Sequence, residues 1–451
     1  GLFMKIDAII LAAGKGKRMQ SASPKVLQQV AGKALLQHVL DTSLELKSCQ
    51  PHIVVGDQAS LVKVSVSAPK NSKWSKQAKQ LGTGHAVKQS LKGLRAGSIA
   101  LILYGDVPLV KSSTMSKLVK AAGKNSLALL SFEQQTPKGY GRIIRSPRGK
   151  VLGIVEEKDA TTEQKKITEV NSGIMAVASN KLEELLKGLK NKNAAKEYYL
   201  TDIVSLANEN KIPVKAVKLD SKEEVLGANN LEELNQLERN YQLLKAKEFS
   251  KKGVIISDPA RVDFRGEVKI QKGSSIDINC VFEGKVEIGK NVIIGPGAII
   301  RNSKIGDGSR IEPYTLIENA ILEKNVTAGP YAHIGPDAHL EENSEIGNFV
   351  EVKRSKIGKG TKAKHLAYIG DGQVSEKVNV GAGTIFVNYD GKNKNKTKVG
   401  KGAFIGSNSS LIAPIKIGQN SMIGAGSVVT SDVPAERLAL GRSRQRNIKK
   451  K

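Results

Sequence analysis

A six-residue spacing of aliphatic residues dominates the second half of the chain and constrains its fold more than any other feature. From about residue 253 onward aliphatic residues recur six positions apart, with occasional five-residue steps such as Ile317 to Leu322. Gly commonly follows the aliphatic residue, as at Ile305-Gly306 and Ile405-Gly406. This period is typical of a parallel β-helix, in which each hexad supplies one short strand and its turn. An antiparallel sandwich would instead alternate with period two. The spacing therefore predicts a β-helix of hexapeptide repeats with the aliphatic side chains inside.

One large insertion interrupts the repeat. Residues 386–398 take thirteen positions where one hexad needs six. Because a stacked coil cannot absorb the additional residues, we expect them to form a loop that projects outward. Projecting loops on a rigid scaffold are common places for binding. By analogy with left-handed members of this fold class, the flat sides of the solenoid also predict a homotrimer.

The first half of the chain lacks the six-residue period. Apolar runs typical of buried strands, at residues 5–11, 52–55, 99–104 and 127–132, alternate with segments of helical spacing. This alternation predicts an α/β domain of Rossmann-like type, with a mostly parallel sheet covered on both faces. The pattern runs to about residue 228.

A different pattern joins the two halves. Leu231, Leu234 and Leu237 begin a series of apolar residues three or four positions apart, which predicts one long amphipathic helix. The expected organisation is an α/β domain at 1–228, a linker helix at 229–252, a β-helix at 253–437 and a basic tail at 438–451.

Composition narrows the classes of protein to which the chain can belong. With 39% hydrophobic and 25% charged residues it is neither collagen-like nor wholly disordered. No apolar run approaches the ~20 residues of a membrane helix, and the N-terminus has no secretory pattern. The two cysteines are too few for a disulfide framework or a zinc cluster. We therefore expect a cytoplasmic protein without a membrane partner.

The net charge of +28 is less ordinary. Such a surface attracts nucleotides and phosphorylated substrates. Nucleic-acid binding is the less favoured alternative, because the lysines are spread along the chain and aromatic residues make up only 4% of it.

A glycine-containing segment follows the first predicted strand. It reads Leu-Ala-Ala-Gly-Lys-Gly-Lys-Arg-Met over residues 11–19, and Pro24-Lys25 comes soon after. Glycines allow backbone N–H groups to approach polyphosphate oxygens, and the cations add positive charge. The segment is not a dinucleotide fingerprint, since Met19 stands where the third Gly would be, nor a P-loop. The predicted nucleotide-binding residues here are Leu11, Ala12, Ala13, Gly14, Gly16, Arg18 and Lys25.

Further motifs follow this segment in a recognisable order. They are Gln77 with Leu81-Gly82-Thr83-Gly84-His85, then Tyr104-Gly105-Asp106-Val107-Pro108, Gly139-Tyr140-Gly141-Arg142, residues 155–159, Asn171-Ser172-Gly173 and residues 227–230. Together with the glycine segment they resemble the sugar-phosphate nucleotidyltransferase family. In that chemistry a sugar 1-phosphate attacks the α-phosphate of a nucleoside triphosphate in line, and pyrophosphate leaves. Catalysis consists of positioning and charge neutralisation. Asp106, just past a predicted strand, and Asn229 are the predicted Mg²⁺ ligands.

With the hexapeptide half, residues 4–442 resemble the bacterial bifunctional N-acetylglucosamine-1-phosphate uridyltransferase / glucosamine-1-phosphate N-acetyltransferase family. The resemblance implies that acetyl-CoA acetylates glucosamine 1-phosphate in the second half of the chain. N-acetylglucosamine 1-phosphate is then joined to UMP from UTP in the first half, giving a precursor of cell wall and lipopolysaccharide. It implies that Gln77, Gly82 and Thr83 read uracil. The sugar contacts that it implies are Gly141, Glu156 and Asn171, and Tyr104, Gly105, Asp106 and Asn229 complete the predicted set of nucleotide- and sugar-binding residues.

The second predicted site lies in residues 362–371. His365 is the expected general base, taking a proton from the substrate amine as it attacks the thioester, a task that suits an imidazole. Glu351, on a neighbouring coil, is a candidate to orient it. By the resemblance, Lys353, Tyr368, Asn379, Asn388 and Tyr389 bind the sugar phosphate. Ala382, Ser407, Ala425 and Arg442 line the acetyl-CoA groove.

One position departs from the family pattern. At Gly335 the family carries an Arg on the acetyl-acceptor side, and the basic position just before it is His333 here. Loss of a phosphate-binding cation costs about 1.5–3 kcal/mol of binding. An alternative therefore stays open, in which the chain is a uridyltransferase only and the β-helix serves trimerisation or regulation.

Overall fold

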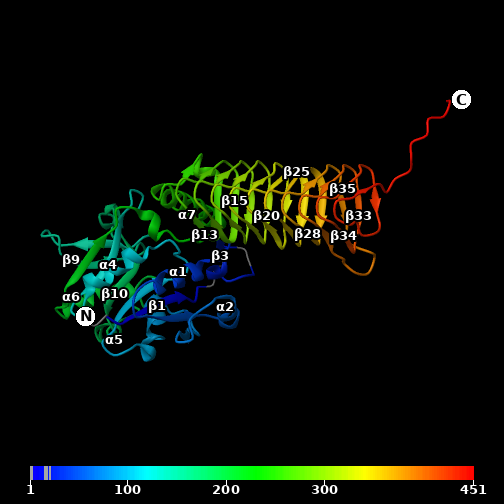
Figure 1. Ribbon diagram of the computed structural model, residues 1–451. Coiled ribbons are helices and arrows are strands. Elements are labelled where there is room, and N and C mark those ends of the chain that lie inside the picture. The colour runs from blue at the N-terminus through cyan, green and yellow to red at the C-terminus, as the bar shows by residue number, and fades with distance from the viewer. Residues whose placement is uncertain (1–3, 15–18, 20–21, 451) are drawn as a thin grey trace. The chain divides into compact units, whose positions relative to one another are not determined.

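The structure, a computed structural model, describes residues 4–14, 19 and 22–450. The chain divides into two compact units, Gly1–Asn240 and Tyr241–Lys451. The boundary falls within helix α7 (Leu231–Lys251), which occupies the segment for which the sequence predicts a long amphipathic helix. Figure 1 shows both units with their elements labelled.

The first unit is built on a nine-stranded sheet. Its strands are β1 (Ile6–Ala12), β4 (Cys49–Val55), β5 (Lys73–Lys76), β6 (Ile99–Tyr104), β7 (Leu127–Glu133), β8 (Arg142–Arg145), β9 (Val151–Val155), β10 (Glu169–Ala178) and β11 (Val214–Lys218). The main path runs β11-β7-β10-β6-β1-β4-β5, with β8 paired to β10 and β9. Strand β1 pairs in parallel with β4 and β6, whereas β10 is antiparallel to β6 and β7. The sheet is therefore mixed, with a parallel centre.

Helices cover both faces of this sheet. They are α1 (Leu35–Leu44), α2 (Ala59–Ser65), α3 (Thr83–Lys88), α4 (Ser112–Ala122), α5 (Ser179–Lys187) and α6 (Ile203–Glu209), and a small hairpin joins β2 (Gln29–Val30) to β3 (Lys33–Ala34). Alternate residues of β1 enter opposite cores: Ile10 packs with α1 and α4, and Ile9 packs with α3, α5 and α6. A strand buried on both faces reads as a continuous apolar run. This is why the run at the start of the chain carries no period-two alternation.

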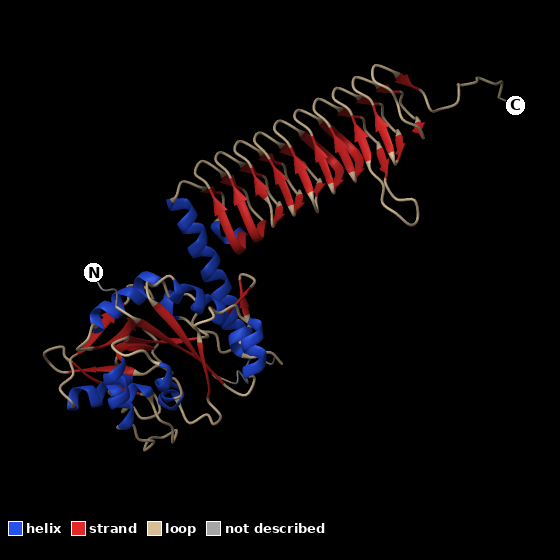
Figure 2. Ribbon diagram, turned by 60° about the horizontal axis from the view of Figure 1, so that its bottom comes forward, coloured by secondary structure: helices blue, strands red, loops and turns tan. Residues whose placement is uncertain are grey.

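The second unit is a 26-stranded parallel coil (Figure 2). Its strands are β12 (Ile255–Ile256), β13 (Val262–Ile270), β14 (Ser275–Ile276), β15 (Cys280–Ile288), β16 (Ile293–Ile294), β17 (Ile299–Arg301), β18 (Lys304–Ile305), β19 (Arg310–Ile311), β20 (Leu316–Glu318), β21 (Ala320–Leu322), β22 (Thr327–Ala328), β23 (His333–Ile334), β24 (Ala338–Leu340), β25 (Glu345–Lys353), β26 (Ser355–Ile357), β27 (Lys362–Gly370), β28 (Gly372–Val374), β29 (Asn379–Val380), β30 (Ile385–Val387), β31 (Thr397–Val399), β32 (Phe404–Ile405), β33 (Ser410–Ile412), β34 (Ile415–Ile417), β35 (Met422–Ile423), β36 (Val428–Val429) and β37 (Leu438–Ala439).

The coil has the repeat length that three hexads require. Val262 pairs with Cys280 in the next coil, a separation of three full hexads, and Ile299 pairs with Leu316, one position short of three hexads. The periodic aliphatic side chains point inward, as Ile305, Ile311 and Ile317 are at most 2% exposed. Each coil therefore buries its aliphatic residues against those of the coils before and after it.

The glycines after the aliphatic residues are explained by close approach between coils. A Cβ on Gly306 would lie 2.5 Å from the carbonyl carbon of Glu323 in the next coil, and one on Gly347 would lie 2.0 Å from the Lys364 oxygen. Neither glycine has a left-handed φ. The glycine is needed here for space rather than for turn geometry.

The predicted insertion leaves the coil. Ile385 pairs with Tyr368 in the coil before it and with Ser410 in the coil after it. The stretch of chain from Ile385 to Ser410 is longer than that from Tyr368 to Ile385 by more than one hexad, so the excess lies outside the stack. Within the loop, Tyr389 forms an antiparallel bridge with Lys394. Figure 2 shows this loop projecting from the stacked strands.

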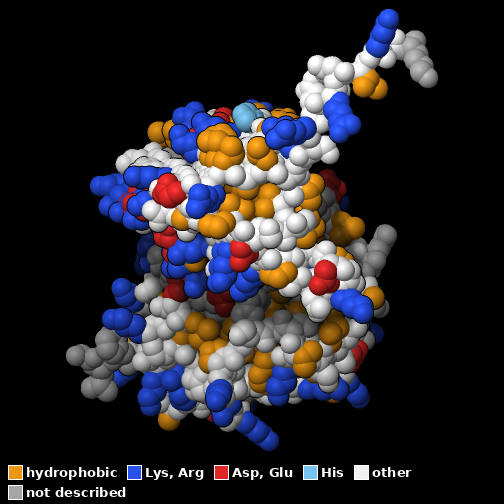
Figure 3. Space-filling view, turned by 45° about the vertical axis from the view of Figure 1, so that its right-hand side comes forward, with side chains coloured by type: hydrophobic (Ala, Val, Ile, Leu, Met, Phe, Trp, Pro, Cys, Tyr) orange, Lys and Arg blue, Asp and Glu red, His pale blue; other side chains and the backbone are white. Residues whose placement is uncertain are grey.

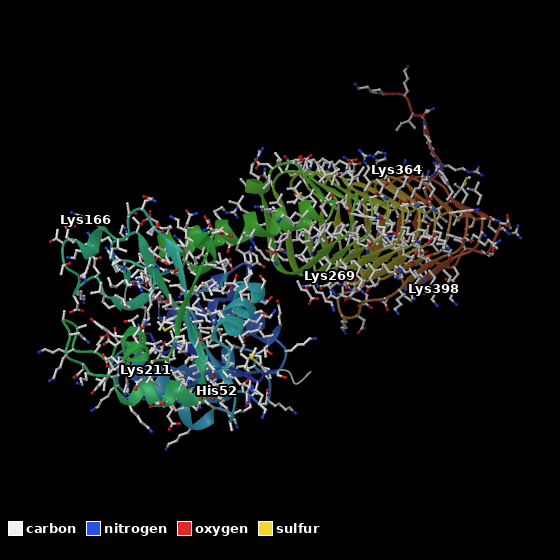
Figure 4. All side chains as sticks on the ribbon, turned by 90° about the vertical axis from the view of Figure 1, so that its left-hand side faces the viewer. His52, Lys166, Lys211, Lys269, Lys364 and Lys398 are labelled. Atoms are coloured by element: carbon white, nitrogen blue, oxygen red, sulfur yellow. The ribbon has the colours of Figure 1, made fainter. Side chains whose placement is uncertain are left out.

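Lysine and arginine side chains are distributed over both units. Figure 3 shows them scattered across the visible face among apolar side chains, and in Figure 4 the labelled Lys364 and Lys398 extend from the β-helix. Many of them are paired, such as Lys364 with Glu345 at 2.7 Å. No helix among the described residues is both long and apolar enough to cross a membrane.

Candidate active sites

A lysine bridges the two predicted metal ligands in the first unit. Lys25 Nζ lies 2.5 Å from Asp106 Oδ2 and donates a hydrogen bond to Asn229 Oδ1 at 2.8 Å. Asp106 follows β6 at the carboxyl end of the parallel strands, whereas Asn229 comes from the segment just before α7. The fold thus brings a carboxylate and an amide oxygen from distant segments around one cationic position.

A cavity of about 260 Å³ opens beside this position. It is lined by nine of the predicted nucleotide-site residues, Leu11, Ala13, Gly14, Lys25, Gln77, Gly82, Thr83, Tyr104 and Asp106. Lys25 lies in the short 3-10 helix Lys25–Leu27. The other residues lie at or just after the ends of β1, β5 and β6 or at the start of α3, because the carboxyl ends of parallel strands meet at one edge of the sheet. Ala12 lines a neighbouring cavity of about 320 Å³ together with Ala13 and Gly14.

The amide of Gln77 is held from two sides. Its Nε2 donates to the Gly82 carbonyl oxygen at 3.2 Å and lies 3.0 Å from His85 Nδ1. Gln77 is only 4% exposed although it lines the cavity.

The predicted sugar-side residues form a second group next to the cavity. Asn171 N donates to Gly141 O at 2.9 Å, and a Cβ on Gly141 would lie 3.4 Å from Glu156 Oε1. Thr201 Oγ1 donates to that Glu156 oxygen at 3.0 Å. Burial raises the pKa of Glu156, and Asp202 and Asp159 raise it further. Asn171 Oδ1 is buried and has no hydrogen-bond partner among the described residues.

Tyr104 and Gly105 connect the two groups. A Cβ on Gly173 would lie 2.8 Å from the Tyr104 ring, so the tyrosine packs directly on that glycine. A Cβ on Gly105 would meet Val26 at 3.1 Å and the Leu11 oxygen at 3.2 Å, which explains the glycine before Asp106.

Two expected residues cannot be placed, and four cavity residues are not among the predicted ones. Gly16 and Arg18 lie outside the described residues. The unpredicted lining residues are the apolar Val26 and Ala86 and the polar Gln80 and Glu197. Gln80 donates its amide to the Ala13 carbonyl, and its place three residues after Gln77 was the available signal. For Glu197, more than a hundred residues away along the chain, no sequence signal was available.

In the second unit, His365 lies on β27 and is exposed. It stands beside Asn348 in the register of β25 and β27. Glu351, the candidate orienting residue, instead pairs with Lys353 at 2.7 Å, and its register partner is Tyr368. In the single chain, therefore, the carboxylate of Glu351 is engaged by Lys353.

A charged pair anchors two of the predicted sugar-phosphate residues. Arg354 Nε and Nη2 donate to the two oxygens of Asp371 at 2.8 and 3.2 Å. Asn388 Nδ2 donates to Asp371 Oδ2 at 2.6 Å and lies 3.2 Å from Tyr368 Oη. Hydrogen bonding to Arg354 lowers the pKa of Asp371. The root of the projecting loop is thus tied to the coil by a carboxylate.

The remaining predicted residues of this half lie along successive coils. Ala382 and Ser407 follow one another at one corner, since Asn408 N donates to Ala382 O and Gly426 N donates to Ser407 O. Ala425 occupies the next coil, and Arg442 Cδ would lie 3.9 Å from a Cβ on Gly426. Asn379 pairs with Lys362 on β27, and Tyr389 is exposed on the loop. These residues therefore lie within a few adjacent coils.

The backbone at Gly335 fits only glycine. Its φ is +108°, and a Cβ would lie 1.7 Å from the Glu318 oxygen. His333 Nε2 lies 2.9 Å from Glu318 Oε1. This corner is therefore built without a cationic side chain at position 335, and the neighbouring imidazole is paired with a carboxylate.

Comparisons with known proteins match the α/β unit and the β-helix to different domain families. The MobA-like NTP transferase domain matches residues 8–198, the GMPPB C-terminal domain matches residues 264–334, and the bacterial transferase hexapeptide repeat matches residues 319–354 and 396–431. The chain is 49% identical to the "Bifunctional protein GlmU" of Idiomarina loihiensis, over 99% of this chain and 97% of that protein. The proteins of the same name from Marinobacter nauticus and Dechloromonas aromatica are 46% and 48% identical, each over 98% of this chain and 97% of theirs. This chain belongs to the GlmU family.

Membership of the GlmU family confirms three predictions. The resemblance to the bifunctional uridyltransferase and acetyltransferase family is confirmed. The fold class is a nucleotidyltransferase α/β domain followed by a left-handed parallel β-helix of hexapeptide repeats. The chain is a bifunctional enzyme, a uridyltransferase and an acetyltransferase.

Proposed function

We propose that the chain converts glucosamine 1-phosphate to UDP-N-acetylglucosamine in two reactions at two separate sites. The observation that carries this proposal is the pair of residue sets: a cavity with Gln77, Lys25 and Asp106 in one unit, and in the other an exposed His365 on β27, the strand whose Tyr368 is hydrogen-bonded by Asn388. UTP, acetyl-CoA and the two sugar phosphates are the proposed small-molecule partners. We also propose a cytoplasmic location and a homotrimer.

In uridyl transfer, a phosphate oxygen of N-acetylglucosamine 1-phosphate bonds to the α-phosphorus of UTP, and the bond to the leaving pyrophosphate breaks. The residues from Leu11 to Gly14 and Lys25 hold the triphosphate, Gln77 with the Gly82–Thr83 segment holds the base, and Gly141, Glu156 and Asn171 hold the sugar. Because attack and departure need no covalent enzyme intermediate, these residues act by positioning and by charge.

Asp106 and Asn229 would hold Mg²⁺. The ammonium of Lys25 lies between their oxygens, so that position accommodates a cation. One carboxylate and one amide oxygen are few ligands, which suits Mg²⁺, since this ion usually completes its shell with water and substrate phosphates. When bound, Mg²⁺ supplies neutralisation of phosphate charge.

In acetyl transfer, the amine of glucosamine 1-phosphate attacks the thioester carbonyl of acetyl-CoA. His365 accepts the amine proton as the new C–N bond forms, and the CoA thiol leaves. Lys353, Tyr368, Asn379, Asn388 and Tyr389 hold the acceptor. Ala382, Ser407, Ala425 and Arg442 hold the donor.

The surroundings of His365 support the proposed trimer. His365 is exposed in the single chain, and its apolar neighbours Phe349 and Leu366 are 62% and 61% exposed. Covering a reaction site excludes water, which would otherwise compete with the amine for the thioester. A neighbouring copy packed along this side of the coil would cover the reacting amine.

A uridyltransferase with a non-catalytic β-helix is the second candidate, although the bifunctional relatives argue against it. Gly335, whose backbone admits no side chain, favours it. The anchored Asn388 opposes it, because a purely structural coil has no need for an amide that is fixed to Asp371 and Tyr368 at the root of a projecting loop.

Two assays and two substitutions test the proposal. Thiol release from acetyl-CoA is measured with glucosamine 1-phosphate and without UTP, and pyrophosphate release is measured with UTP and N-acetylglucosamine 1-phosphate. We expect His365→Ala to abolish the first and spare the second, and Asp106→Ala to do the reverse. If the unmodified protein releases pyrophosphate but releases no thiol in the presence of glucosamine 1-phosphate, the second candidate is established. Loss of both activities in one folded variant would contradict two separate sites.

A further inference from the structure

A histidine that none of the proposed roles uses fixes the amide of Gln77. His85 is the third residue of the short helix α3, which begins at Thr83. Its Nδ1 is 3.0 Å from Gln77 Nε2, and the same Nε2 lies 3.2 Å from the Gly82 carbonyl oxygen. The Nε2 end of the Gln77 amide therefore contacts both the Gly82 carbonyl oxygen and His85 Nδ1.

The Gly82 carbonyl determines which amide end this is. A carbonyl oxygen only accepts, so it requires the N–H end of the Gln77 amide. In the opposite orientation, the Gln77 oxygen would lie against the Gly82 oxygen at about the same separation, and two acceptors would face each other without a proton. With Nε2 directed at Gly82 and His85, Oε1 is left to the cavity that Gln77 lines. No hydrogen bond to this oxygen is formed within the described part of the chain.

The second contact requires His85 Nδ1 to be an acceptor. A neutral imidazole carries its proton on one nitrogen only, so an accepting Nδ1 places the proton on Nε2. Gln89, one turn along, donates its amide N–H to the His85 carbonyl at 2.9 Å, so its nitrogen, 3.4 Å from His85 Nε2, does not need that ring nitrogen as an acceptor. Desolvation lowers the pKa of His85, and the nearby charge of Lys88 lowers it further. Both effects favour the neutral ring that this arrangement needs.

We propose that His85 is a positioning residue for base selection: it holds the Gln77 amide so that Oε1 accepts a hydrogen bond from a pyrimidine bearing an N–H at ring position 3. This inference rests on the proposed uridyltransferase function and deepens it. Uracil carries a donor at that ring position. Cytosine carries a lone pair there, which would face the Gln77 oxygen with no proton between them. A site whose buried acceptor is left unpaired discriminates strongly against the wrong ligand.

The matched variants are His85→Ala and His85→Asn. Alanine removes one of the two acceptors and leaves only the Gly82 carbonyl to hold the Gln77 amide, so the amide turns over more easily. Asparagine can place its Oδ1 near the position of Nδ1 and so can still accept from Gln77. Gln89→Ala is the control, because it alters the other side of the ring and leaves Nδ1 in place. Pyrophosphate release is measured with N-acetylglucosamine 1-phosphate and with UTP or CTP as the nucleotide.

We expect His85→Ala to lower the UTP/CTP ratio of kcat/KM by about tenfold or more, the range of one hydrogen-bonded group in a specificity site. The loss should appear as a higher KM for UTP at nearly unchanged kcat, because the reacting phosphates are held elsewhere. His85→Asn should recover most of the ratio, and Gln89→Ala should keep it.

Other outcomes overturn the inference. If His85→Ala lowers kcat/KM for both nucleotides by the same factor, the histidine has a structural role only. If His85→Ala is unstable, two other variants decide the question. Gln77→Glu carries a carboxylate, which presents oxygen at both ends. An unchanged UTP/CTP ratio of kcat/KM in Gln77→Glu, together with a low ratio in His85→Asn, would exclude control of base selection through the Gln77 amide. Absence of pyrophosphate release in the unmodified protein would refute the proposed uridyltransferase site itself, and is thereby distinguished from a failure of the inference.

Discussion

At the scale of single residues, the structure places polar side chains where each controls the orientation of another. Lys25 lies between Asp106 and Asn229, and Asp371 connects Arg354 to Asn388. Such contacts between charged groups are short and directional, so they fix a side chain more firmly than apolar packing does. Two predictions follow from contacts of this kind.

The first concerns Arg354 as a positioning residue for acetyl transfer. Arg354→Lys keeps the charge but loses the two parallel hydrogen bonds to Asp371, so the carboxylate holds Asn388 less firmly. We expect the KM for glucosamine 1-phosphate to rise about tenfold, the effect of one charge-assisted hydrogen bond, with kcat nearly unchanged. Steady-state thiol-release kinetics measure both constants.

The matched control is Lys356→Ala. It removes the 2.8 Å ion pair between Lys356, on β26, and Glu341, and it leaves the contacts of Asp371 unchanged. An equal rise in KM in both variants would show that general surface charge, rather than the Arg354–Asp371 contact, sets the affinity for the sugar phosphate.

The second prediction concerns the buried carboxyl of Asp7 in β1. Arg95 Nε donates to Asp7 Oδ1 at 2.8 Å, and His52, labelled in Figure 4, lies 3.2 Å from the same oxygen. Burial by itself raises the pKa of Asp7, but hydrogen bonds from His52, Ser98 and Arg95 outweigh it and lower the pKa from 3.8 to about 2. A lowered folded-state pKa means that the stabilisation is present above the unfolded-state pKa and is lost as pH falls through the folded-state pKa.

We therefore expect the free energy of unfolding to decrease by about 2 kcal/mol through this group as pH falls from about 4 to about 2. Asp7→Asn should lack this part of the pH dependence and be less stable at neutral pH. Urea unfolding at several pH values measures it. Asp41→Asn, which breaks an exposed pair with Lys33, should change the free energy of unfolding by at most about 0.5 kcal/mol. Parallel pH curves for the unmodified protein and Asp7→Asn would contradict the assignment.

At the scale of elements, the β-helix and the α/β sheet solve the same packing problem in different ways. A strand such as β1 needs helices on both faces, because its side chains alternate between two cores. A coil of the β-helix needs only the coils before and after it. The stability of the coil is therefore sensitive to the backbone spacing between coils, which the glycines preserve.

Gly306→Ala tests that spacing. The new methyl would lie 2.5 to 2.7 Å from the backbone of Glu323 and Lys324, so the neighbouring coil has to shift. Overpacking of this kind costs about 1–3 kcal/mol, and thermal or urea unfolding of the second unit measures it. Lys304→Ala, at an exposed position of the same coil, is the control and should change little. Equal stability of the two variants would mean that the coils can separate at no cost.

At the scale of the whole molecule, two compact units have separate apolar cores and carry separate clusters of candidate site residues. The cavity beside Asp106 is lined by residues of the first unit, and His365 with Asn388 belongs to the second. Each unit therefore supplies the residues of its own candidate site, which is why a substitution in one is expected to spare the activity of the other.

The chain's local patterns determined which elements form. The six-residue period predicts the β-helix because each hexad contacts only equivalent positions one coil away, so a local repeat is enough to specify the stack. The excess of residues at 386–398 predicts the projecting loop by the same counting. The glycine segment after β1 and the motif around Asp106 mark the edge of the sheet where the cavity is found. The family resemblance supplied the candidate roles of most named site residues.

Only the tertiary structure decided how those side chains engage one another. Nothing in the sequence shows that Lys25 and Asn229, 204 positions apart, share a hydrogen bond, that Glu351 pairs with Lys353 rather than His365, or that His85 holds Gln77. Glu197 reaches the cavity from a distant loop. The physical reason is that periodicity fixes strands and their registers locally. The partner of a polar side chain depends instead on where loops distant in sequence come to lie, and on which donors and acceptors remain unpaired there.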